Sequence, residues 1–344
     1  MKYSSKPFLL LVVASMLAVG VWLLLGSRTP SSRADAGAAQ RIESFRPALR
    51  EDEEKYLSLL ERNVVSGGPP KDGIPSIDKP KYTPAKEADE WLLPDDVVFG
   101  LQQGGFIAAY PQRILVWHEI VNDRVADRPV SVTYCPLTGT AMGFYGELSS
   151  GVSTRFGVSG KLLNSNLLMY DRASDSYWPQ MLGKAIAGPA KGVALSEFPL
   201  TWTTWERWKR KHPDTLVLSR STGFFRDYGR GGDPYGSYLE RSKGYYDSET
   251  LLFSPVHQDR RLPPKTIVVG VRDANGNALA VRKDALRERG TIEAKLGGRA
   301  VVVRYDAELD SHRVEIKGSG ERPLAFDAMW FAWAAFYPGT QLIQ

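Results

Sequence analysis

The sequence predicts an α+β fold, mostly antiparallel β, with two tandem related halves after one N-terminal membrane helix. Three observations support this: an uncharged apolar run near the amino terminus, short β-rich segments bounded by turn residues, and four sequence blocks that recur in order. The chain has 344 residues, 43% hydrophobic and 24% charged, which is enough for a sizeable core. A net charge of +5 without a basic stripe argues against nucleic acid as a partner.

The apolar run covers residues 8–26 and contains no charged side chain. A helix of about 20 apolar residues crosses a ~30 Å hydrocarbon core, whereas a cleaved signal usually has an apolar region of about 7–15 residues. We therefore predict that residues 1–26 anchor the protein in the cell (inner) membrane as a single-pass span. A cleaved signal segment is the alternative. Because no second span follows, the main domain is expected to be extracytoplasmic, in the periplasm.

Residues 27–70 are predicted to be a linker with one short helix. Ser, Gly and Ala in 27–45 indicate a flexible tether, and the apolar spacing within 47–65 indicates the helix. The Pro-rich stretch 67–84 is expected to be an extended arm lying on the domain.

From residue 97 the pattern changes to short strands that are rich in β-branched and aromatic residues. Gly104-Gly105 is typical of a hairpin turn between two of them. The four predicted strands are 97–101, 106–110, 113–117 and 130–134.

Four blocks of this region recur later in the chain, which predicts an internal duplication. The last of them has the form W-x-x-W-x4-P-x-T, with its tryptophans on one side of a helix. The matched pairs are 98–101 with 268–271, 107–115 with 278–286, 129–134 with 300–305, and Trp205–Thr215 with Trp330–Thr340.

The duplication divides the chain into a first half, 71–266, and a second, degenerate half, 267–344. The first half contains a functional insert at about 145–200 and a Gly- and Tyr-rich connecting loop, residues 223–246, that leads to the second half. His118 aligns with Arg289 and Cys135 with Asp306, so the second half lacks both soft side chains. Function is therefore expected in the first half.

Motifs of both halves, from Asp72–Pro75 through Val132–Thr140 to Trp330–Trp333, resemble one family, the bacterial and archaeal "domain of unknown function 3179". Many of its members have Cys-Pro-Leu-Cys where this chain has Cys135-Pro-Leu-Thr138. This chain therefore lacks the second thiol of a C-x-x-C pair. The resemblance implies no particular reaction. The motifs are Asp72–Pro75, Ala109–Pro111, Trp117–Asp123, Val132–Thr140, Phe156–Gly160, Asn164–Asn166, Met169–Arg172, Trp178–Gln180, Thr204-Trp205 and Trp330–Trp333.

Cys135, the only cysteine, has three interpretations. It is a small buried hydrophobe, a thiolate ligand of a metal ion, or a nucleophile with His118 as its base. As a ligand it would bind a soft metal, copper first, together with His118, Met142, His257 and also Met169, because thiolate and thioether ligands select Cu(I).

The polar and aromatic residues of the insert are the predicted ligand-binding set: Ser159, Asn164, Asn166, Asp171, Arg172, Trp178 and Gln180. Three functions therefore stay open. The first is a membrane-anchored envelope protein that binds copper near Cys135 and His118. The second is a Cys/His-dependent enzyme acting on envelope polymers. The third is a non-catalytic module that binds a glycan or a protein partner through the insert.

Overall fold

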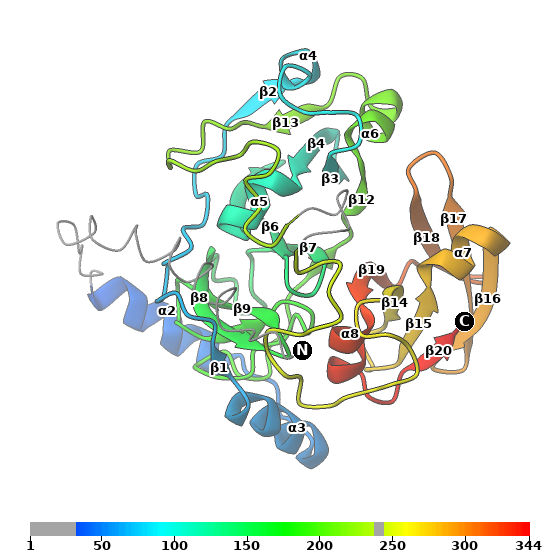
Figure 1. Cartoon of the computed structure of the whole chain (residues 1–344). Helices are drawn as coiled ribbons and strands as arrows, with labels where there is room; N and C mark the ends of the chain where they lie inside the picture. The colour runs from blue at the N-terminus through cyan, green and yellow to red at the C-terminus, as the bar shows by residue number, and fades with distance from the viewer. Residues whose placement is uncertain (1–31, 237–243) are drawn as a thin grey trace, which may run out of the picture.

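The computed structural model describes residues 32–236 and 244–344, and most of its regular structure is antiparallel β-sheet with short helices, an α+β architecture (Figure 1). The strands after residue 267, coloured gold to red in Figure 1, lie to one side of the earlier strands. The helices are α2 Ser32–Ser44, α3 Glu51–Arg62, α4 Ala85–Ala88, α5 Gln112–His118, α6 Trp205–Lys211, α7 Lys283–Arg289 and α8 Trp330–Phe336.

Three sheets precede residue 220, with strand orders β12-β3-β4-β13-β2, β11-β7-β6-β5 and β1-β8-β9-β10. Their paired strands are antiparallel except for β13 with β4. The strands are β1 Val65–Ser66, β2 Tyr82–Pro84, β3 Val97–Gln103, β4 Phe106–Pro111, β5 Ile120–Val125, β6 Arg128–Cys135, β7 Thr140–Tyr145, β8 Phe156–Leu163, β9 Asn166–Asp171, β10 Tyr177–Pro179, β11 Glu197–Phe198, β12 Thr201–Thr204 and β13 Leu216–Leu218.

Two further sheets follow, with orders β19-β14-β15-β20 and β16-β17-β18. The first of them has the strand order of β12-β3-β4-β13, including a parallel outer pair, β15 with β20. The second has the order of β5-β6-β7. The strands are β14 Ile267–Arg272, β15 Ala278–Arg282, β16 Thr291–Leu296, β17 Arg299–Asp306, β18 Ser311–Ile316, β19 Leu324–Met329 and β20 Gln341–Ile343.

A tryptophan of each W-x-x-W helix packs on a glycine of the sheet. The ring of Trp208 on α6 occupies the space that a Cβ at Gly100 would need. Its Nε1 donates a hydrogen bond to Thr215 Oγ1 at 3.0 Å. In the second half the ring of Trp333 on α8 packs on Gly270 in the same way, and its Nε1 donates a hydrogen bond to Thr340 Oγ1 at 3.0 Å. Close approach of ring and backbone requires glycine there, which explains why the motif and the glycine recur together.

Two predicted elements are wrong. Residues 113–117 form helix α5 instead of a strand, because their apolar side chains bury a helix face between Pro111 and the left-handed residue Glu119. The β-branched residues in this run favoured a strand, and tertiary packing overrides that preference. Helix α2 replaces much of the predicted tether, since the stretch 34–39 is rich in alanine, the strongest helix former.

The predicted hairpin turn and helix 47–65 are confirmed, the former between β3 and β4 and the latter as α3. The predicted span 8–26 lies outside the described residues. Within 32–236 and 244–344 no helix is long and apolar enough to cross a membrane.

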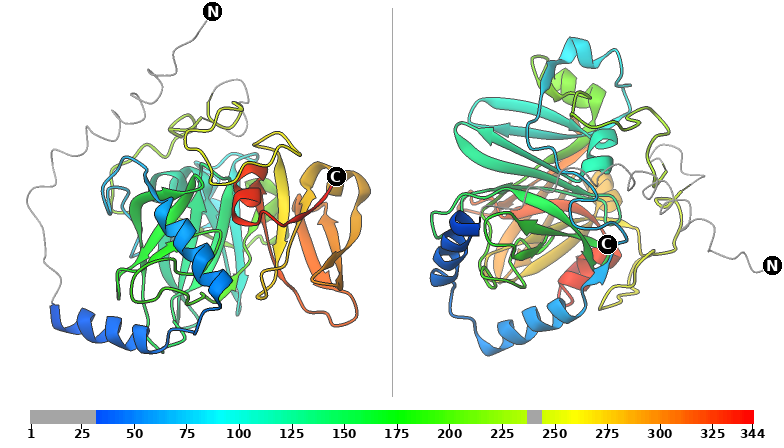
Figure 2. Two further views of the ribbon diagram at one scale, coloured as in Figure 1. Left: turned by 90° about the horizontal axis from the view of Figure 1, so that it is seen from below. Right: turned by 90° about the vertical axis from the view of Figure 1, so that its left-hand side faces the viewer.

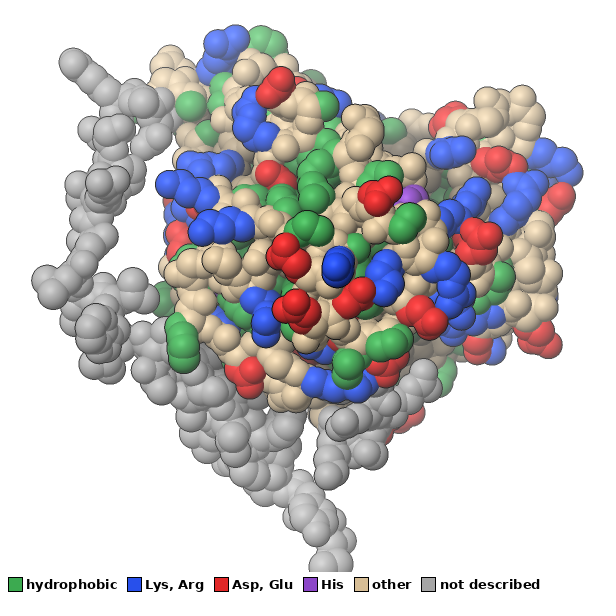
Figure 3. Space-filling view, turned by 90° about the horizontal axis from the view of Figure 1, so that it is seen from above, with side chains coloured by type: hydrophobic (Ala, Val, Ile, Leu, Met, Phe, Trp, Pro, Cys, Tyr) green, Lys and Arg blue, Asp and Glu red, His purple; other side chains and the backbone are tan. Residues whose placement is uncertain are grey.

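Helices α2 and α3 lie on the outside of the molecule (Figure 2). Tyr56 of α3 donates its hydroxyl to the Phe336 carbonyl at 2.7 Å, and Glu53 pairs with Lys184 of the insert. Helix α3 therefore contacts both halves. A nearly buried ion pair, Glu197 with Arg272 at 2.5 Å, also joins the halves. On the surface, acidic and basic side chains are interspersed over the face in Figure 3.

Candidate functional site

Cys135 ends strand β6 and is buried, with 1% of its surface exposed. The Leu167 amide donates to Sγ at 3.3 Å, and the Ser165 carbonyl oxygen lies 3.6 Å from Sγ. Burial first, and the Glu119 carboxyl second, raise the pKa of the Cys135 thiol to about 11. Hydrogen bonds from Thr138 and Leu167 act in the opposite direction, because they favour the thiolate. At neutral pH the sulfur is therefore a thiol that has thiolate-stabilising donors already in place.

Glu119 directly follows helix α5 and adopts a left-handed conformation with φ 56°. Its amide donates to the Leu115 carbonyl at 2.7 Å, and its carbonyl accepts the Tyr134 amide at 2.8 Å. Only 6% of Glu119 is exposed, and its carboxyl has no hydrogen bond or ion pair within the described residues. Burial raises its pKa to about 8. The carboxyl is therefore mostly protonated at pH 7 and can donate a proton.

Residues of the connecting loop complete the surroundings of this pair. The Tyr245 hydroxyl donates to the Leu137 carbonyl at 2.8 Å, beside the turn that follows Cys135. Burial raises the pKa of Tyr235 well above its ordinary value, and the charges of Glu119 and Cys135 add to this effect. The neighbourhood is thus formed by the end of α5, the turn after β6, the β8–β9 turn and the connecting loop.

His118, the predicted base, is fully buried and uses both ring nitrogens elsewhere. Nδ1 lies 2.7 Å from the Pro75 carbonyl, so it carries the proton, and Nε2 accepts the Tyr228 hydroxyl at 2.6 Å. Burial lowers its pKa to about 4, which keeps the ring neutral. No hydrogen bond joins it to Cys135 among the described residues. In this arrangement His118 attaches the extended arm, residues 67–84, and the connecting loop to α5.

The predicted ligand residue Arg172 also contacts the arm, residues 67–84. Its guanidinium lies 3.4 Å from Asp72 and 3.5 Å from Asp78. Asn122 donates to the same Asp78 carboxylate at 2.6 Å. Arg172 therefore holds the arm against the insert.

Asn166 and Gln180 lie in a buried side-chain network. Gln180 Oε1 accepts Thr140 Oγ1 at 2.6 Å and Asn166 Nδ2 at 2.9 Å, while its Nε2 donates to Thr133 Oγ1 at 2.9 Å. Asn166 Nδ2 also lies 3.1 Å from the hydroxyl of Thr138, which hydrogen bonds to the Cys135 sulfur. This network connects the insert to β6 and β7 and positions the turn beside Cys135.

Asp171, Trp178 and Ser159 have structural partners as well. The Asp171 carboxylate accepts the Trp178 Nε1 at 3.0 Å and backbone amides of the turn 173–176. The hydroxyl of Ser159 donates to a backbone carbonyl of β9. These side chains fix the insert.

Asn164 differs from the other predicted ligand residues. It is 3% exposed, and its Oδ1 accepts the Val256 amide at 2.8 Å. Its Nδ2 is buried with no hydrogen-bond partner in the described part of the chain. Buried donors are normally paired, so this amide has capacity for a ligand.

The predicted metal ligands are only partly brought together. Met142 and Met169 are buried in the hydrophobic cluster that contains Cys135, whereas His257 is exposed on the loop before β14. Across residues 32–236 and 244–344 there is no group of three or more His, Cys, Asp or Glu side chains that could hold a metal ion.

Sequence reasoning missed the role of Glu119, although the duplication contained a signal. Glu119 aligns with Gly290, which has φ 71° and follows helix α7 in the same way. Glycine suits a left-handed position, and a glutamate there is unusual. The aligned pair could therefore have identified Glu119.

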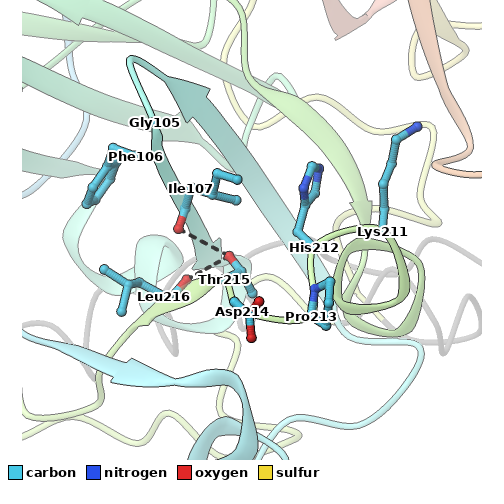
Figure 4. Close-up of a pocket in the computed structure, with 9 residues that line it drawn as sticks. All are labelled: Gly105, Phe106, Ile107, Lys211, His212, Pro213, Asp214, Thr215 and Leu216. Atoms are coloured by element: carbon cyan, nitrogen blue, oxygen red, sulfur yellow. Dashed lines mark hydrogen bonds between the residues drawn. The ribbon is translucent and has the colours of Figure 1, made fainter.

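An open cavity of about 420 Å³ lies at a different place, between the β3–β4 hairpin and the loop after α6 (Figure 4). Phe106 and Ile107 line one side of it and His212 the other (Figure 4). These segments differ from those around Cys135. We favour the Cys135 neighbourhood as the site, because it contains two buried titratable groups with shifted pKa values, Cys135 and Glu119, and the unpartnered amide of Asn164 lies on an adjoining turn.

Comparison with known proteins gives a family but no characterised relative. Neither a curated protein nor a solved structure matches the chain. The family described as "Protein of unknown function (DUF3179)" matches residues 71–319, which include Cys135, Glu119 and the whole insert. The chain belongs to this family, DUF3179.

Proposed function

We propose that the protein is an envelope enzyme of carbonyl chemistry, in which Cys135 is the nucleophile and Glu119 transfers the proton. The supporting observation is the buried, unpaired and largely protonated Glu119 carboxyl beside the Cys135 thiol. A carboxylic acid kept neutral at pH 7 is a proton donor, and its conjugate base is strong enough to accept one. Glu119 thus takes the role that the sequence suggested for His118.

The proposed step adds the thiol across a carbonyl group. As the sulfur–carbon bond forms, Glu119 gives its proton to the carbonyl oxygen. The resulting carboxylate takes the proton of the Cys135 thiol, so all atoms and charges balance. With an ester, the adduct then transfers its hydroxyl proton through Glu119 to the leaving alcohol, which leaves a thioester that water hydrolyses.

The donors around Sγ support this step. The amides of Thr138 and Leu167 and the Thr138 hydroxyl stabilise negative charge as it develops on sulfur. Because they are fixed by the insert network, they need no reorganisation during the reaction.

Copper binding is the second candidate. It is favoured by three sulfur-containing side chains of the large hydrophobic cluster, Cys135, Met142 and Met169, which are all buried. A coordinated thiol loses its proton, so Cu(I) would lower the pKa of Cys135. His118 cannot join this set while both its nitrogens are hydrogen-bonded.

The location and the duplication are part of the same proposal. We infer that residues 8–26 anchor the protein in the inner membrane with the main domain in the periplasm. We also infer that the two halves arose by duplication, which is supported by their shared strand order. Envelope polymers with ester or amide bonds are the proposed substrates.

The test uses p-nitrophenyl acetate and follows acetylation of Cys135 by mass spectrometry. We expect Cys135→Ser to abolish acetylation and Glu119→Gln to slow it by roughly 100-fold or more, the usual contribution of a general acid–base group. Asp306→Ser, at the aligned position of the second half, is the control and should leave the rate unchanged.

The pH dependence of the acetylation rate distinguishes this mechanism from direct attack by a Cys135 thiolate. Because the reactive form contains the neutral thiol and protonated Glu119, the acetylation rate should be nearly constant at lower pH and fall as the pH passes about 8. A rate that climbs steadily toward the thiol pKa, with Glu119→Gln equal to wild type, would rule out the proposal. Stoichiometric copper in the purified protein, lost in Cys135→Ser, would favour the second candidate.

A further inference from the structure

We propose that Asn164 Nδ2 binds the carbonyl oxygen of the substrate as a second donor beside Glu119, which assigns the substrate to the acyl compounds, esters or amides. This inference rests on the proposed attack by Cys135. The observation behind it is independent, since it is the buried and unpartnered side-chain amide of Asn164.

The β8–β9 turn places Asn164 close to the sulfur. Asn164 and Ser165 are the two turn residues, with φ 53° and 61°, between the paired positions Leu163 and Asn166. The carbonyl oxygen of Ser165 lies 3.6 Å from Cys135 Sγ, and the amide of Leu167 donates to the same sulfur. The turn that carries Asn164 is therefore part of the sulfur's surroundings.

The orientation of the Asn164 amide is fixed by its other end. Oδ1 accepts the Val256 amide at 2.8 Å, and a flipped side chain would set two N–H donors against each other. Ser165 Oγ donates to the Phe253 carbonyl at 2.8 Å, which secures the turn on the segment 253–256. Nδ2 is thus a rigid donor.

A rigid, buried donor beside a nucleophile stabilises an oxyanion. When Sγ adds to an acyl carbon, negative charge develops on the carbonyl oxygen, and hydrogen bonds to that oxygen speed the step. Nδ2 offers two hydrogens without partners in the described residues. Displacement at a saturated carbon forms no oxyanion and gains nothing from such a donor.

This contrast defines the experiment, which compares two reactions of Cys135 in the full-length protein. Asn164→Asp keeps the acceptor for the Val256 amide but removes the donor, and Asn164→Gly removes the side chain while tolerating positive φ. In both variants we expect acetylation by p-nitrophenyl acetate to slow by roughly 100- to 1,000-fold, the usual loss for one such donor. Alkylation by iodoacetamide should stay within about twofold of wild type.

Asp306→Ser, in the second half and outside this turn, is the control and should acetylate within about threefold of wild type. Wild-type acetylation rates in both Asn164 variants would overturn the inference, as would an equal loss in the two reactions. A wild-type protein that is alkylated but never acetylated would instead contradict the proposed function, and this inference would fall with it.

Discussion

The two halves place different residues at the same backbone position, after helices α5 and α7. Glu119 and Gly290 each donate an amide hydrogen bond back to the helix, to Leu115 and Leu286. Each also accepts the amide of a tyrosine from the next β-strand pair at 2.8 Å. The positive φ of this position suits glycine and costs other residues about 1 kcal/mol or more.

The first half therefore retains a residue that is unfavourable twice, through its backbone and through its buried, unpaired carboxyl. Local strain and unpaired polar groups of this kind concentrate at functional sites. The second half also buries a carboxylate, Asp327, but this one forms an ion pair with Lys283, which lowers the pKa of Asp327, although its Oδ1 has no hydrogen-bond partner in the described residues. The carboxyl of Asp327 thus has a cation beside it, whereas the pKa of Glu119 is shifted by burial alone, and this difference favours a functional role for Glu119.

The largest expected effect tests what the halves share. Trp208→Ala and Trp333→Ala should each lower the free energy of unfolding by roughly 3–5 kcal/mol, because each empties a fully buried ring site over a glycine. Urea unfolding of both variants measures this. If one substitution were nearly neutral, the two helix–sheet contacts would not be equivalent.

Glu119→Gln tests the difference between the halves through pH. A carboxyl whose pKa rises from 4.5 to about 8 on folding gives stability that is full below pH 4.5 and lost as the pH rises through 8. The glutamine side chain does not ionise, so Glu119→Gln does not lose stability in this way as the pH rises. At about 1.36 kcal/mol per pKa unit, the variant should be more stable than wild type by roughly 3–5 kcal/mol near pH 9 and equal to it near pH 4. The free energies of unfolding of both proteins at the two pH values measure this. An equal difference between variant and wild type at pH 4 and pH 9 would show that Glu119 is not buried as an acid.

Much of the fold could be predicted from the sequence, because strands, the Gly104-Gly105 hairpin and the Trp helices depend on local patterns. Helix α5 could not, since its short apolar run suits a strand equally well until tertiary packing decides. The candidate site that we favour contains the predicted residue Cys135 but not its predicted partner His118. Cys135 was named, but the partners of His118 come from Pro75 and Tyr228, which are distant in sequence. No local pattern reveals that these contacts occupy the imidazole.

The smallest effect concerns the backbone alone. Gly290→Ala places a side chain at a left-handed position in open space, so it should cost about 1 kcal/mol, from strain only. Thermal unfolding at pH 6 measures this loss. An unchanged or increased stability would mean that the position tolerates side chains, and Glu119 would then be less unusual than we argue.

The central claim is that the first half keeps Glu119 for function at the expense of stability, and Glu119→Gly tests it most directly. This substitution gives the first half the residue of the second. Unfolding free energy and the acetylation rate of Cys135 should be measured on the same preparation at pH 8. We predict that stability rises by at least about 1 kcal/mol, the backbone strain alone, while acetylation slows by roughly 100-fold. A variant that is less stable than wild type, or that is acetylated at the wild-type rate, would contradict the account.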